Sequence, residues 1–60
     1  MDDELVLYTL RTRTIQELLY KRHEHETLAR MCEGAGNLTT ANDNWYMAGL
    51  CDRVIAEQAA

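Results

Sequence analysis

The sequence has 60 residues, a formal net charge of −4, and neither proline nor phenylalanine. A chain of this length forms one domain at most, and it buries only about 60% of the surface that it exposes when unfolded. The acidic charge argues against a general electrostatic grip on nucleic acid, which needs clustered lysine and arginine, and no apolar run approaches the ~20 residues of a membrane span.

Residues 1–13 are expected to form an apolar N-terminal arm within the single domain 1–60. The leucines of the arm share one helical face with Leu18, which favours extra helical turns ahead of the next helix. The alternative is a short strand over residues 4–12, because Thr12 and Arg13 interrupt the helical pattern.

The first long helix is predicted over residues 14–33. Thr14 and Glu17 stand three residues apart ahead of an apolar run, which is the pattern of a capping box. Residues 21–27, near the middle of this helix, are all polar. Within that polar run, His25 is the side chain expected to point inward.

A loop is predicted over residues 34–39, because glycines there follow the end of a periodic run. Glycine at this place takes the left-handed conformation without a Cβ penalty and ends a helix. Thr39 or Thr40 is then expected to cap a second long helix over residues 40–58.

These elements predict an all-α fold, an antiparallel two-helix hairpin with the apolar arm in front of it. The register of the hairpin sets the small residues Ala48 and Gly49 level with the polar run, so the core is thin there. The arm extends beyond the end of the second helix. Burial of a large apolar side chain is worth about 1.5–3 kcal/mol, so a second copy, a different protein or a fold-back must cover the arm. A homodimer in which each arm lies across the other subunit is the simplest prediction.

An uncovered arm and two adjacent aromatic residues predict a surface that binds a partner. Trp45 and Tyr46 point about 100° apart on a helix, so one is expected to enter the core while the other faces outward. The predicted partner-binding residues are Leu5, Leu7, Tyr8, Leu10, Arg11, Trp45 and Tyr46.

No catalytic residue, cofactor or metal ligand is predicted. His23 and His25 point to different sides of a helix and cannot chelate together. Cys51 comes level with His23, so a pair of His25 and Cys51 across the hairpin is geometrically possible, and a dimer doubles it into a four-ligand zinc site. A solvated polar run beside a buried thiol is the preferred interpretation. Cys32 and Cys51 differ too much in register to form a disulfide, so both are expected to pack as small apolar residues.

The expected function is that of a small acidic, non-catalytic regulator or inhibitor. It is expected to form a homodimer and to bind a larger macromolecular target, a protein. Proteins of this kind are common in phages and plasmids. The chain begins Met1-Asp2-Asp3-Glu4, whereas a secretory signal begins with positive charge, so a cytoplasmic location is expected. A structural subunit of a larger assembly is one alternative.

A second alternative follows from the strand interpretation of residues 4–12. The order strand, helix, Gly/Asn turn and helix resembles the ribbon-helix-helix family, and the resemblance rests on topology over most of the chain. It implies a DNA-binding transcriptional regulator in which Thr9, Arg11 and Arg13 read the major groove from a paired ribbon. The first helix is longer than in that family, and the chain is acidic, which disfavours nucleic acid as a partner.

Overall fold

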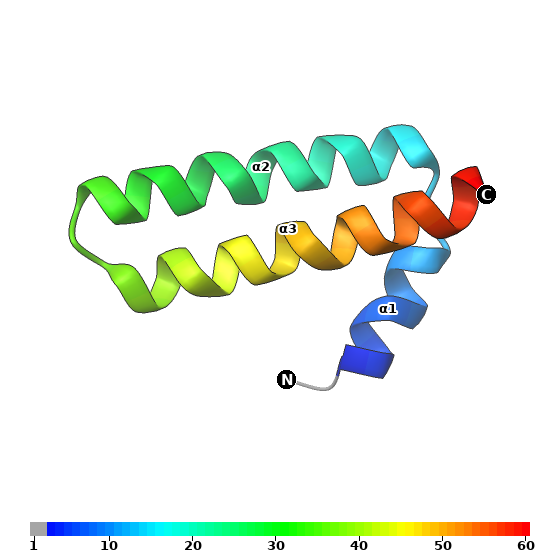
Figure 1. The fold of residues 1–60 in the computed structure, drawn as a ribbon, viewed down its shortest axis with the longest axis horizontal. Coiled ribbons are helices and arrows are strands. Elements are labelled where there is room, and N and C mark those ends of the chain that lie inside the picture. The colour runs from blue at the N-terminus through cyan, green and yellow to red at the C-terminus, as the bar shows by residue number, and fades with distance from the viewer. Residues whose placement is uncertain (1–2) are drawn as a thin grey trace.

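The computed structural model describes residues 3–60, which form three α-helices and no strand (Figure 1). Their bounds are Asp3–Arg11 for α1, Ile15–Gly34 for α2 and Leu38–Ala59 for α3. The all-helical prediction is confirmed for this part of the chain. Met1 and Asp2, which belong to the acidic start used to predict a cytoplasmic location, lie outside the described residues.

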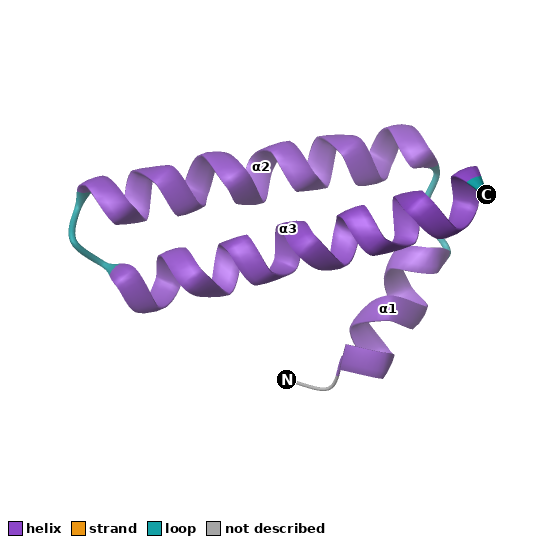
Figure 2. Ribbon diagram, in the orientation of Figure 1, coloured by secondary structure: helices purple, strands orange, loops and turns teal. Residues whose placement is uncertain are grey.

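The helices α2 and α3 lie side by side and run in opposite directions, and α1 packs against α3 (Figure 1). Short connections link the three helices in chain order (Figure 2). The short turn between α1 and α2 therefore determines how α1 is oriented relative to the two long helices.

The strand alternative for residues 4–12 is wrong, because residues 4–11 belong to α1 and Thr12 lies in the turn after it. Leu7 and Leu10 are three residues apart and both face the interior, as one side of a helix requires. Asp3 in the first turn and Arg11 in the last turn also complement the helix dipole. The ribbon needed for the resemblance to ribbon-helix-helix proteins is thus absent from residues 3–60, and the DNA-binding alternative loses its structural basis.

A three-residue turn separates α1 from α2. Thr14 caps α2: its hydroxyl accepts a hydrogen bond from the backbone N–H of Glu17 at 3.1 Å, and the Glu17 carboxylate accepts one from the backbone N–H of Thr14 at 3.0 Å. The predicted capping box is confirmed. The Thr14 hydroxyl also donates a hydrogen bond to the Glu17 carboxylate. The bond from the Thr14 backbone N–H and, second, this hydroxyl bond lower the pKa of the Glu17 carboxyl.

Residues 35–37 join α2 to α3. Gly36 has a φ of +80°, a left-handed conformation that glycine adopts at little cost. Asn37 caps α3, since its side-chain oxygen accepts a hydrogen bond from the backbone N–H of Thr40 at 3.2 Å. The predicted cap at Thr39 or Thr40 is therefore wrong. The helix begins earlier because Asn37 directly follows the glycine turn and already reaches the third amide of the helix.

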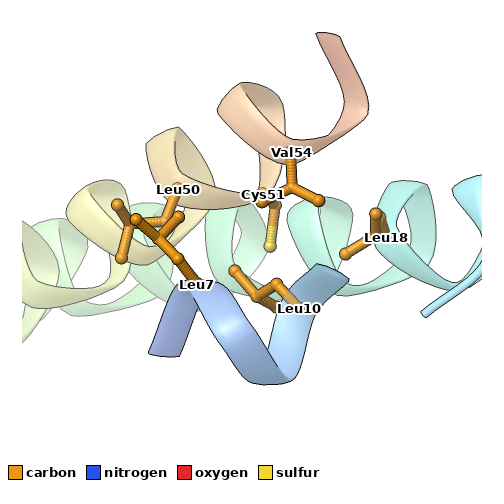
Figure 3. Close-up of a cluster of buried hydrophobic side chains, with 6 residues drawn as sticks. All are labelled: Leu7, Leu10, Leu18, Leu50, Cys51 and Val54. Carbon is orange, nitrogen blue, oxygen red and sulfur yellow. The ribbon is translucent and has the colours of Figure 1, made fainter. Parts of the chain in front are cut away.

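The main core lies where the three helices meet. Figure 3 shows Leu7 of α1 beside Leu50 of α3, and Leu10 of α1 pointing toward Cys51 of α3. The expectation that a hairpin leaves the arm uncovered is wrong for these two leucines, which are 0% and 5% exposed. The turn before α2 folds α1 back onto α3, so the chain itself covers them. The buried cluster consists of Leu7, Leu10, Leu18, Leu50, Cys51 and Val54.

Toward the α2–α3 loop, the two long helices pack through small residues. Ala29 of α2 and Ala41 and Ala48 of α3 are buried there. His25 points toward α3, as predicted, and its Nδ1 donates a hydrogen bond to the Asn44 side-chain oxygen at 2.9 Å. Small side chains and polar contacts such as this one connect the two helices at this level.

Candidate interaction surface

Polar contacts fix α1 on α3 near both ends of α1. Arg11 donates two hydrogen bonds to the Glu57 carboxylate, at 2.9 and 3.0 Å. These bonds lower the pKa of the Glu57 carboxyl. At the start of α1, the Tyr46 hydroxyl donates a hydrogen bond to the Asp3 carboxylate, which raises the pKa of Tyr46. Because the inner side of α1 packs against the core and both of its ends are hydrogen-bonded to α3, the opposite side of α1 faces outward.

The predicted partner-binding residues on α1 divide between its two sides. Leu7 and Leu10 lie on the inner side and are buried in the core. Leu5 and Tyr8 lie on the outer side and are 64% and 70% exposed. Leu5 and Tyr8 therefore form the exposed apolar patch of α1.

The two predicted aromatic residues of α3 face different helices. Trp45 is half-buried, its Nε1 donates a hydrogen bond to Glu33 of α2 at 3.2 Å, and the Arg30 guanidinium lies 5.6 Å from its ring centre. Tyr46 is exposed and contacts Asp3 of α1. The structure thus brings Tyr46 to the same helix as the α1 patch, whereas Trp45 joins α3 to the last turns of α2.

A second apolar surface, on the outer side of α2, was missed by the sequence analysis. Tyr20 and Met31 are 66% and 65% exposed, and Leu28 is 47% exposed. The available signal is periodicity, because these three positions do not share the helical face of Leu18 and Ala29.

Shallow depressions flank Tyr20 along this side of α2. Lys21 belongs to the first depression and also to a third one beside α1, so the concave surface continues from one helix to the other. The first depression is lined by Gln16, Glu17, Tyr20, Lys21 and Glu24. The second is lined by Tyr20, His23, Glu24, Thr27 and Leu28. The third is lined by Leu5, Val6, Thr9, Leu10, Arg13, Lys21 and Met47.

Charge pairing singles out two residues of this surface. Among residues 3–60, Lys21 and Glu24 form no ion pair. Glu24 is exposed on the outer side of α2, whereas Lys21 is half-buried at the edge of that side, where it also borders α1. Charges of opposite sign thus lie next to Tyr20 and Leu28, and we call Tyr20, Lys21, Glu24 and Leu28 the α2 outer face. Every arginine, in contrast, has an ion pair within the chain: Arg11, Arg13, Arg22, Arg30 and Arg53.

The two free cysteines differ in accessibility. Cys51 is fully buried, and burial raises the pKa of its thiol, whereas Cys32 is only partly buried. A thiol-alkylating reagent at neutral pH is therefore expected to modify Cys32 in the folded chain and Cys51 only when the chain opens. Mass spectrometry of the alkylated protein, with and without urea, measures both rates. Equal rates without urea are incompatible with the buried position of Cys51.

Metal-ligand chemistry has little to build on in this part of the chain. Among residues 3–60, no three His, Cys, Asp or Glu side chains are placed to hold a metal ion. His25, which was considered as a partner of Cys51, forms a hydrogen bond with Asn44.

Comparison of the chain with protein-family models, with curated proteins and with solved structures gave no match. Within residues 3–60, none of the helices combines the length and the apolar character needed to cross a membrane. The candidate site is the apolar and concave surface that runs from Leu5 on α1 to Leu28 on α2.

Proposed function

We propose that the chain is a small non-catalytic regulator or inhibitor that forms a homodimer and binds a larger protein target. The observation that carries this proposal is the exposure of large apolar side chains. Leu5, Tyr8, Tyr20 and Met31 are each more than 60% exposed, in a chain of 60 residues. Apolar side chains that are exposed beside shallow depressions mark interaction sites on small soluble proteins.

The charge of the chain supports a basic protein surface as the target. The net charge is −4, and the arginines are already paired with carboxylates of the same chain. An excess of negative charge speeds encounter with a basic surface and disfavours acidic partners. A nuclease, a polymerase or a transcription factor has such a surface, and blocking one of them fits a phage- or plasmid-type regulator. We also propose a cytoplasmic location, where free thiols such as these two persist.

Affinity capture from a host lysate tests the proposal when it compares matched variants. The double variant Leu5→Asp/Tyr8→Asp is expected to lose a target that the unmodified chain retains, by about tenfold or more, because charge is placed in the apolar contact. Both positions are exposed, so circular dichroism should show an unchanged helix content.

The control is Thr39→Asp/Asn42→Asp, which adds the same charge at exposed polar positions of α3. It is expected to retain the target. Loss of the same proteins from both variants, or from neither, contradicts docking through α1. Recovery of several proteins in fixed proportion points to a structural subunit of an assembly instead.

A further inference from the structure

We propose that the second copy in the homodimer contacts the α2 outer face, with the two α2 helices antiparallel about a two-fold axis. The axis lies level with Arg22 and His23, between Lys21 and Glu24. This inference rests on the homodimer proposed above and names the surface that forms it.

The charges favour a second copy over any other occupant. A two-fold contact requires a surface that is complementary to itself. Lys21 and Glu24 are three residues apart and so are neighbours on the surface of the helix, and neither has an ion pair within residues 3–60. Antiparallel helices place Lys21 of each copy opposite Glu24 of the other. A basic partner meets repulsion from Lys21 and an acidic partner from Glu24, whereas the chain's own copy satisfies both.

The same charges set the relative direction of the helices. In a parallel arrangement with matched register, Lys21 faces Lys21 and Glu24 faces Glu24, and both contacts are repulsive. The antiparallel arrangement converts these contacts into two ion pairs. The pattern of charge thus selects the antiparallel arrangement.

The shape of the surface agrees with this register. Leu28 of one copy comes level with Glu17 of the other, where the first depression beside Tyr20 lies. Tyr20 of one copy comes level with His25 of the other, next to the depression that reaches Leu28. The exposed side chains of each helix therefore project toward depressions of the other, as in knobs-into-holes packing.

Sedimentation equilibrium of the full chain and three charge variants tests the contact. Lys21→Glu alone places like charges against Glu24, and Glu24→Lys alone places like charges against Lys21. Each is expected to weaken self-association by about tenfold or more. The double variant Lys21→Glu/Glu24→Lys is expected to associate as the unmodified chain does. An equimolar mixture of the two single variants is expected to form a heterodimer, because every ion pair is restored across the contact.

Asp43→Lys provides the matched control, since it changes the charge as Glu24→Lys does, at an exposed position outside the α2 outer face. It is expected to leave association unchanged. If the unmodified chain dimerises but the single variants do so equally well, the dimer uses another face and this inference is overturned while the homodimer stands. If the unmodified chain is a monomer at every concentration, the homodimer falls as well, and binding of the target through α1 is judged separately by the Leu5/Tyr8 variants.

Discussion

Replacing Leu7 with alanine is expected to lower the free energy of unfolding by about 2–5 kcal/mol. Leu7 is fully buried in the cluster where α1 meets the other two helices (Figure 3). The substitution removes apolar contact and leaves a cavity, and a single core of this size rarely supplies more than about 3–5 kcal/mol. The substitution should therefore remove a large part of the stability of the fold. Urea denaturation followed by circular dichroism measures the change.

Leu5→Ala is the control for Leu7→Ala, because Leu5 lies on the same helix but on its exposed side. Its effect on the free energy of unfolding is expected to stay within about 0.5 kcal/mol. If Leu7→Ala is as mild as Leu5→Ala, α1 does not belong to the core. The earlier interpretation of the whole arm as a partner-binding element then regains its basis.

Replacing Ala48 with leucine is expected to destabilise the chain by about 1–3 kcal/mol through overpacking. Ala48 is buried on α3, one helical turn from Asn44 and one from Asp52, and both of these bond to α2. A larger side chain at this level pushes the two long helices apart. Thermal unfolding followed by circular dichroism should show a melting temperature several degrees lower.

The matched control is Ala56→Leu, two turns farther along α3 at an exposed position. Its melting temperature is expected to remain close to that of the unmodified chain. Equal melting temperatures for the two leucine variants would mean that the helices do not approach closely at Ala48.

Local signals made most of the secondary structure predictable. The Thr14–Glu17 capping box and the glycine turn at Gly36 act within a few residues of sequence, so spacing alone was enough to identify them. The cap at Asn37 was missed because Thr39 and Thr40 offered the same chemistry nearby, and only the geometry of the turn selects among the three.

The fold-back of α1 was not predictable by the same means. The turn before α2 contains neither glycine nor proline, so no local signal marks a reversal of direction. The contact of Arg11 with Glu57 joins residues far apart in the sequence, and Leu7 joins the core cluster with residues of α3 only because the chain reverses. Leucine spacing alone therefore could not distinguish a separate helix from an extension of α2.

The candidate surface was predicted only in part, for a related reason. Leu5, Tyr8 and Tyr46 are exposed as a partner-binding role requires. The α2 outer face depends on which charges remain unpaired once the helices pack. Ion pairs such as Arg22 with Asp52 exist only in the folded chain, so Lys21 and Glu24 could not be singled out from the sequence.

The exposed α2 outer face of this small chain is proposed to bind a second copy. Sedimentation equilibrium of the unmodified chain tests this most directly. The apparent mass is expected to rise with concentration from the 6.9 kDa of one chain to twice that value. Added salt is expected to lower it, because salt screens the proposed Lys21–Glu24 pairs across the contact. A constant mass of one chain across the whole concentration range would contradict a dimer that uses the α2 outer face.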